Sequence, residues 1–195
     1  MHDRGGLTEN PQVGMVGNMH DHENPNGIGA LLFVDADSCP RQLRTIILKA
    51  ILRRNIPAIF AADRPLPDVV QAEGSGTTDM HGLPLVRMVV VHKGDDSADD
   101  MLVTLGREGA LAITRDIPLA KRLAQLGMVV IDDRGGTYTK ENVGERLSMR
   151  NLMTELREYG VFAERTRPLG PKEVQAFSNA LDRQLTRMLK ALGRS

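Results

Sequence analysis

The sequence predicts an α/β fold in which a mostly parallel five-stranded sheet is covered by helices on both faces. Short, continuous apolar runs alternate along the chain with segments whose apolar residues recur at helical spacing. Apolar runs without alternation are typical of strands that are buried on both faces of a parallel sheet. Pro40 and Gly127 stand where helices tolerate a proline start and a glycine end.

The first half of the chain contains two predicted strands and one clear helix. The strands are expected at residues 30–37 and 57–63. The helix lies between them, opens at Pro40 and has the apolar residues of one face at Leu43, Ile46, Ile47, Ala50 and Ile51. Residues 64–84 contain three prolines and a Gly-Ser-Gly sequence, so a long loop with at most a short helix is expected there.

The second half continues the alternation and ends in helices. Three more strands are expected at 86–93, 110–116 and 128–133, and two helices are expected between them, at 97–109 and 117–127. Ser97 or Asp96 would cap the first of these helices. Two C-terminal helical stretches are expected at 140–160 and 171–192. Residues 1–28 show no periodicity and predict a flexible tail, which leaves residues 29–195 as one domain.

Composition restricts the class of protein. Hydrophobic residues make up 41% of the chain and aromatic residues only 3%, so the core must be aliphatic. The 25 basic and 25 acidic residues balance, and net charge therefore gives no support for bulk binding to nucleic acid or membrane. Neither a signal peptide nor an apolar run of membrane-spanning length is visible. The single Cys39 excludes an intrachain disulfide. We therefore expect a cytoplasmic protein without a membrane partner, and the composition leaves a homo-oligomer open.

Acidic residues stand where the predicted parallel strands end. Because the carboxyl ends of parallel strands lie along one edge of a sheet, these carboxylates are expected to gather there. Each of them has an alternative role as a helix cap, and Asp63 is interpreted as a turn residue. Carboxylates held close together repel unless a cation neutralises them, and such hard oxygen ligands suit Mg²⁺ or Mn²⁺. The acids concerned are Asp35, Asp37, Asp96, Asp99, Asp100, Asp116, Asp132 and Asp133.

Five segments occur in an order that resembles the YaiI/YqxD family, bacterial proteins built on a domain of unknown function numbered 188. They are "FVDADSCP", "DSADDMLV", "AITRDIPLA", "DDRGGTYT" and "ERLSMRNLMTELRE", and the similarity covers about residues 29–190. Members are regarded as PIN-like, related to the PIN and NYN ribonucleases, and no established activity comes with the family. The resemblance implies a PIN-like three-layer sandwich with strand order 3-2-1-4-5.

The resemblance also implies a metal-dependent nuclease, most simply one acting on single-stranded RNA. Its catalytic acids would be Asp35, Asp99 and Asp116, whose carboxylates should converge on one Mg²⁺ or Mn²⁺ ion. Asp37 and Asp96 would be further metal ligands. Asp132 or Asp133 would supply a fourth acid.

Other side chains near these acids have two readings each. Ser38 and Thr114 would bind a phosphate or a metal-bound water, or else cap turns. The four arginines Arg115, Arg134, Arg146 and Arg150 would contact a nucleic-acid backbone, or else form a solvated basic face. No histidine lies near Cys39 in sequence to activate it, so a nucleophilic thiol is not expected.

Two other functions compete with the nuclease. In a phosphatase of the haloacid dehalogenase type, Asp35 would be the nucleophile and Asp37 the acid–base, and Thr114, Lys121 and the Asp132–Asp133 pair would complete the site. That family places a flap between its first motif and first helix, whereas Pro40 leaves no room for one. In the third reading the protein is a non-enzymatic nucleic-acid-binding or assembly module whose acids are structural caps.

Overall fold

The computed structural model describes residues 29–80, 82–91, 98–149 and 168–193. Residues 143–149 are helical and directly precede a range that is not described. Within the described ranges, no helix is both long and apolar enough to cross a membrane. The elements are, in chain order, β1 (Leu32–Asp35), α1 (Arg41–Arg54), β2 (Ala58–Ala62), α2 (Pro67–Gly74), β3 (Val86–Val90), α3 (Ala98–Leu105), β4 (Leu111–Ile113), α4 (Ile117–Gln125), β5 (Val129–Ile131), β6 (Thr137–Tyr138) and α6 (Pro171–Ala191).

The strands form one sheet in the order β3-β2-β1-β4-β5-β6. The first five strands of this order are parallel, which confirms the predicted sheet and its strand order. The sixth strand, β6, was not predicted and pairs antiparallel with β5. It has only two residues, too few for a period to be visible in sequence, and it returns after a tight turn in which Gly135 has φ +83°.

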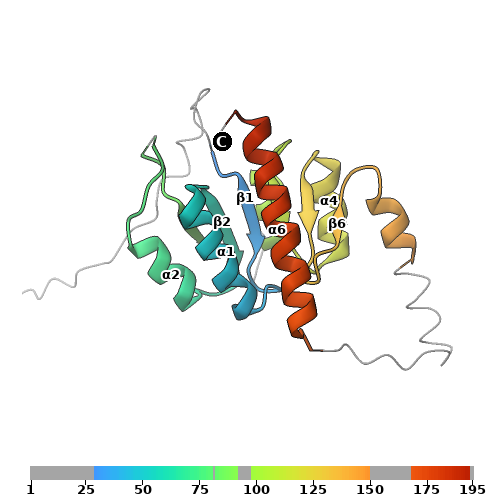
Figure 1. The fold of residues 1–195 in the computed structure, drawn as a ribbon, viewed down its shortest axis with the longest axis horizontal. Coiled ribbons are helices and arrows are strands. Elements are labelled where there is room, and N and C mark those ends of the chain that lie inside the picture. The colour runs from blue at the N-terminus through green and yellow to red at the C-terminus, as the bar shows by residue number, and fades with distance from the viewer. Residues whose placement is uncertain (1–28, 81, 92–97, 150–167, 194–195) are drawn as a thin grey trace, which may run out of the picture.

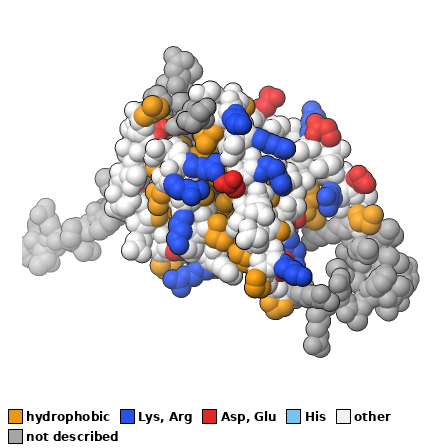
Figure 2. All heavy atoms as spheres, in the orientation of Figure 1, with side chains coloured by type: hydrophobic (Ala, Val, Ile, Leu, Met, Phe, Trp, Pro, Cys, Tyr) orange, Lys and Arg blue, Asp and Glu red, His pale blue; other side chains and the backbone are white. Residues whose placement is uncertain are grey.

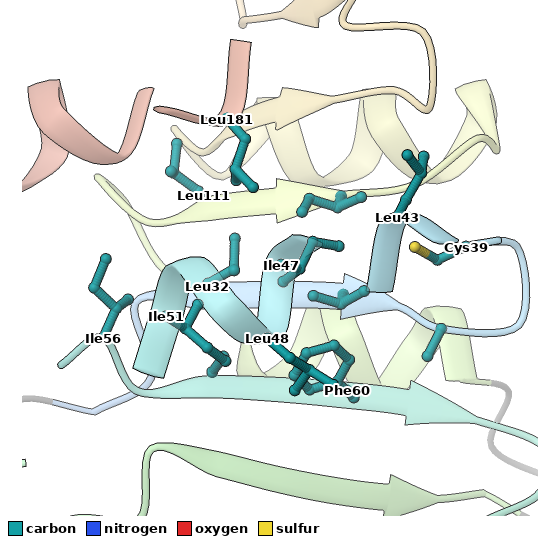
Figure 3. Packing of buried hydrophobic residues seen from close by; sticks show 14 of the residues in the cluster. Leu32, Cys39, Leu43, Ile47, Leu48, Ile51, Ile56, Phe60, Leu111 and Leu181 are labelled. Carbon is teal, nitrogen blue, oxygen red and sulfur yellow. The ribbon is translucent and has the colours of Figure 1, made fainter. Parts of the chain in front are cut away.

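Helices cover both faces of the sheet, as the sequence predicted (Figure 1). Side chains of α1, α2 and α6 pack on one face together with Leu32 and Val34 of β1 (Figure 3). Side chains of α3 and α4 pack on the other face together with Phe33. Because side chains alternate along a strand, Asp35 leaves β1 on the side of Phe33, α3 and α4.

One helix end differs from the prediction. The segment 64–84 contains a short helix, α2, as the prediction allowed, and an antiparallel bridge between Thr78 and Pro84. Helix α3 ends at Leu105, four residues before the predicted end, and Gly109 in the following turn has φ +78°. Gly127 closes the α4 segment at φ +80°, as predicted. The proposed tail, the caps Ser97 and Asp96 and the greater part of the 140–160 helix lie outside the described residues.

Candidate active site

Asp35 is the buried centre of a polar network where β1 ends. Its side chain is only 5% exposed, although it follows three apolar residues of the strand. The Ser38 hydroxyl donates to Asp35 Oδ2 at 2.6 Å, and the Thr114 hydroxyl donates to the same oxygen at 2.7 Å. Asp35 Oδ1 receives one longer hydrogen bond, from Ser38 N at 3.3 Å. This second oxygen therefore has lone-pair capacity left for another ligand.

The two hydroxyls connect Asp35 to the loop after β4. Thr114 Oγ1 accepts from Asp116 N at 2.9 Å, and Ser38 Oγ accepts from Arg115 N at 3.2 Å. Each hydroxyl accepts a backbone N–H, so its own proton is free to point at Asp35. Ser38 and Thr114, predicted to have auxiliary roles, thus hold Asp35 and the 115–116 backbone in a fixed relation.

Asp116 lies at the start of α4, beside this network. Its Oδ1 accepts from Leu119 N at 3.3 Å, so Asp116 caps the helix, which is the alternative role predicted for it. The same position places a carboxylate at the end of β4, the strand that pairs with β1. The crossovers from β1 and β4 run to opposite sides of the sheet, and the gap between these strands is the switch point at which ligands bind in such sheets.

Asp99 brings a third carboxylate to the same edge from the first turn of α3. Its pKa is raised above the ordinary value of 3.8, first by burial and then by the negative charges of Asp35 and Asp116. Arg122 opposes this rise. Three elements far apart in sequence therefore place carboxylates within electrostatic reach of one another. We call Asp35, Asp99 and Asp116 the acidic edge.

The acidic edge fits a hard divalent cation in chemistry and in charge. All of its donors are carboxylate or hydroxyl oxygens, which Mg²⁺ and Mn²⁺ prefer, and a cation would relieve the repulsion felt by Asp99. Among the described residues, however, no group of three or more His, Cys, Asp or Glu side chains is already placed to hold a metal ion. The three carboxylates share an electrostatic field without sharing a preformed coordination site.

Asp37 forms no hydrogen bond with the described loop after β4 that carries Asp116, and its hydrogen-bond partners lie after β2 instead. Its Oδ2 accepts from Asp63 N at 2.6 Å and its Oδ1 from Arg64 at 3.3 Å, both in the loop after β2. Burial raises the pKa of Asp37, and its hydrogen bond from Asp63 N opposes the rise. Asp63, interpreted as a turn residue, is thus also a partner of Asp37. Asp96, the remaining predicted metal ligand, lies outside the described residues.

The adjacent acids after β5 have separate structural partners. Asp132 Oδ1 accepts from Gly136 N at 2.7 Å and from Arg134 N at 2.9 Å, and its Oδ2 accepts from the Tyr138 hydroxyl at 2.7 Å. Asp132 therefore closes the β5–β6 turn. Asp133 is 8% exposed and forms an ion pair with Arg115, Oδ2 to Nε at 3.0 Å. Burial raises the pKa of Asp133 and Arg115 lowers it.

The arginines predicted to bind nucleic acid lie around the ends of β4, β5 and β6 and contact neighbouring side chains. Arg115 pairs with Asp133, and Arg134 Nη1 lies 3.8 Å from Glu173 Oε1 of α6. Arg146 lies over the Tyr138 ring, 5.9 Å from its centroid. Arg150 lies outside the described residues.

Sequence reasoning missed one cation beside the acidic edge. Arg122 of α4 pairs with Asp100 of α3, Nη2 to Oδ1 at 2.6 Å, and lowers the pKa of Asp99. Asp99 and Asp100 are neighbours, yet one faces the acids and the other faces this arginine. No local pattern indicates the pairing, because it depends on how α3 packs against α4.

Cys39 is not a candidate nucleophile. The thiol is 4% exposed, and burial raises its pKa to about 12. At neutral pH it is therefore protonated and behaves as a small apolar core side chain.

The fold and the acidic edge define a class: an α/β protein with carboxylates at the carboxyl ends of neighbouring parallel strands, at the sheet's switch point. The chain belongs to the uncharacterised YaiI/YqxD family, whose model matches residues 33–187. A UPF0178 protein of Treponema denticola is 43% identical over 160 residues, which cover 82% of this chain and 94% of the relative. A UPF0178 protein of Pseudomonas fluorescens (strain Pf0-1) is 40% identical over 159 residues, covering 82% of this chain and 97% of the relative.

Proposed function

We propose that the protein is a divalent-metal-dependent phosphodiesterase that cleaves single-stranded RNA at the acidic edge. The observation that carries this proposal is the meeting of Asp35, Asp99 and Asp116 at the switch point, where Asp99 has a raised pKa caused in part by the other two acids. A carboxyl group whose pKa is raised by burial and by neighbouring charges is typical of functional sites.

The residues of the edge have distinct tasks in this proposal. Asp35, Asp99 and Asp116 would hold Mg²⁺ or Mn²⁺, which supplies an activated water and stabilises the attacking and leaving oxygens of a phosphodiester. The Ser38 and Thr114 hydroxyls keep Asp35 Oδ2 fixed, so that Asp35 Oδ1 is the oxygen available to a ligand. Arg115, Arg134 and Arg146 are the nearby cations proposed to contact the RNA backbone.

The test is cleavage of a labelled single-stranded RNA by purified protein with Mn²⁺ or Mg²⁺. Asp116→Asn should lower the cleavage rate about a hundredfold or more, because a carboxamide is a poor metal ligand. Asparagine is an equally good helix cap, so α4 should remain intact. RNA binding should be unchanged or tighter, since one negative charge is lost near the phosphate. Glu141→Gln, an exposed substitution, is the matched control and should cleave normally.

Two results would replace this proposal. Hydrolysis of small phosphomonoesters with a trappable acyl-phosphate on Asp35 would identify a phosphatase of the haloacid dehalogenase type. The structure gives that reading little room, because only five residues separate Asp35 from α1. If neither RNA, DNA nor any monoester is hydrolysed with either metal, the non-enzymatic module becomes the correct account.

A further inference from the structure

Helices α1 and α6 carry a concentration of positive charge that the balanced composition conceals. The two helices lie side by side on one face of the sheet (Figure 1). Helix α1 contains five basic residues and no acidic one, and α6 contains four basic residues and two acidic ones. Figure 2 shows Lys and Arg side chains gathered over this face.

Seven of these cations are exposed and form no ion pair with any described residue, and five of the seven lie beyond the first turn of their helix. The five are Lys49 and Arg53 of α1 and Arg183, Arg187 and Lys190 of α6. In the part of the chain that the structure describes, none of the five forms an ion pair. We call these five residues the basic face.

Two other arginines of α1 differ from the basic face because each forms an ion pair with an aspartate. Arg44 pairs with Asp68 at 3.0 Å, and Arg54 pairs with Asp182 and donates to Thr186 Oγ1 at 2.9 Å. These arginines are inward-facing and hold α1 to its neighbours. The cations of the basic face have no such structural task, and their mutual repulsion would be relieved by a bound polyanion.

A groove between the two helices adjoins the basic face, and two of the five cations line it. It has a volume of about 530 Å³, an apolar floor formed by Ile46, Ala50 and Leu181, and polar walls. Lys49 and Arg53 form the α1 wall, and Ser178, Asn179 and Asp182 form the α6 wall. The carboxylate of Asp182 is paired with Arg54. The only aromatic residue of the two helices is Phe177, which is fully buried. A ligand here is therefore held through charge and hydrogen bonds and not through base stacking.

Both helices begin at the carboxyl edge of the sheet, the edge along which the proposed site also lies. Helix α1 starts directly after the turn that carries Asp35 and Ser38. The first turn of α6 contacts the loop after β5, where Glu173 lies 3.8 Å from Arg134. A chain lying in the groove would thus reach the carboxyl ends of the strands.

We propose that the basic face binds a single strand of RNA through its phosphates and leads it to the acidic edge. A single strand can place its sugars on the apolar floor of the groove and its phosphates on the cations beside it. That the bound RNA is also the substrate rests on the proposed function. Binding of RNA to the basic face does not require that the RNA is cleaved.

The experiment measures binding of a fluorescein-labelled single-stranded RNA in EDTA, across a salt series, so that no cleavage contributes. The variant K49A/R53A/R183A/R187A should bind at least tenfold more weakly. Its plot of log affinity against log salt should be shallower by about 3, at about 0.7 for each lost phosphate contact. The matched control R87A/K140A removes two exposed cations elsewhere and should bind like the wild type. Coincident thermal melts would show that all proteins are folded.

The outcomes separate this proposal from the nuclease. Loss of binding in the quadruple variant, with normal binding in the control, supports the basic face even if the wild type cuts nothing with Mn²⁺. Equal binding by variant and wild type overturns the basic face, even if cleavage at the acidic edge is confirmed. A duplex or a polyglutamate peptide that binds more tightly than the single strand, with the same dependence on the four cations, also overturns it.

Discussion

At the scale of single residues, Thr114 joins the two strands that meet at the acidic edge. Its buried hydroxyl donates to Asp35 Oδ2 and accepts from Asp116 N. Thr114→Val keeps the shape of the side chain and removes both bonds, leaving a buried carboxylate oxygen with one donor fewer and a backbone N–H unpaired. We expect the free energy of unfolding to fall by about 1–3 kcal/mol in urea titrations. Thr114→Ser keeps the hydroxyl and should lose less; an equal loss in both variants would contradict the role of the hydrogen bonds.

Asp99 predicts a dependence of stability on pH. Its folded-state pKa lies above the ordinary 3.8, because burial and the charges of Asp35 and Asp116 disfavour the anion. Between these two pKa values the native state binds more protons than the unfolded state, so this residue's contribution makes stability fall as pH rises. Above both values the destabilisation is complete. Asp99→Asn should therefore raise the Tm by about 1–2 °C at pH 7 in EDTA, and less at pH 4.

Asp100→Asn provides the control for this measurement. Asp100 is the next residue of α3, but it pairs with Arg122 at 2.6 Å, so its removal should give no gain in Tm. A gain of the same size at pH 4 and pH 7 for Asp99→Asn would show that the effect is not electrostatic.

At the scale of elements, the β5–β6 turn depends on Gly135. This residue has φ +83°, and a Cβ placed there would lie 2.6 Å from the Ala176 carbonyl oxygen of α6. Gly135→Ala combines an unfavourable left-handed conformation with a backbone clash. We expect a loss of about 2 kcal/mol or more in the free energy of unfolding, measured in urea.

Gly144 is the matched comparison. It lies in the helical residues 143–149, and nothing lies within 4 Å of a Cβ built there. Gly144→Ala should stabilise the protein by about 0.5–1 kcal/mol, because alanine loses less backbone entropy in a helix. Equal destabilisation of both alanine variants would contradict the argument that a steric clash and a left-handed backbone make Gly135 necessary.

Elements with long, periodic signals could be predicted from sequence, and those set by a few residues could not. The five parallel strands and their order follow from buried apolar runs and a family resemblance. The two-residue β6 and the early end of α3 depend on local turn geometry. The strand ends indicated where the carboxylates gather. They did not indicate that Asp37 accepts a hydrogen bond from Asp63 N, or that Asp99 lies within the electrostatic reach of Asp35. The contact of Asp37 depends on how the loops after β1 and β2 meet, whereas the placement of Asp99 and the pairing of Arg122 with Asp100 depend on how α3 packs against α4.

At the scale of the whole molecule, the balanced charge of the chain separates into regions of opposite sign. Three carboxylates gather at the carboxyl edge of the sheet, and the five cations of the basic face lie along α1 and α6, which begin at that edge. Net charge averages over this separation and therefore could not reveal it. A polyanion held by the basic face would meet repulsion at the acidic edge unless a cation were bound there, so the proposed binding of metal and the proposed binding of RNA would support each other.

The proposed binding of a metal ion can be tested on the folded protein without any substrate. A cation that binds only the native state at a hundred times its Kd adds about 2.7 kcal/mol of stability. For a chain of 195 residues this corresponds to a rise in Tm of about 5–10 °C with Mn²⁺. The double variant Asp35→Asn plus Asp116→Asn should show no rise, whatever its own Tm, and Glu141→Gln should show the full rise. An absent shift in the wild type, or an undiminished shift in the double variant, would show that the acidic edge is not the metal site.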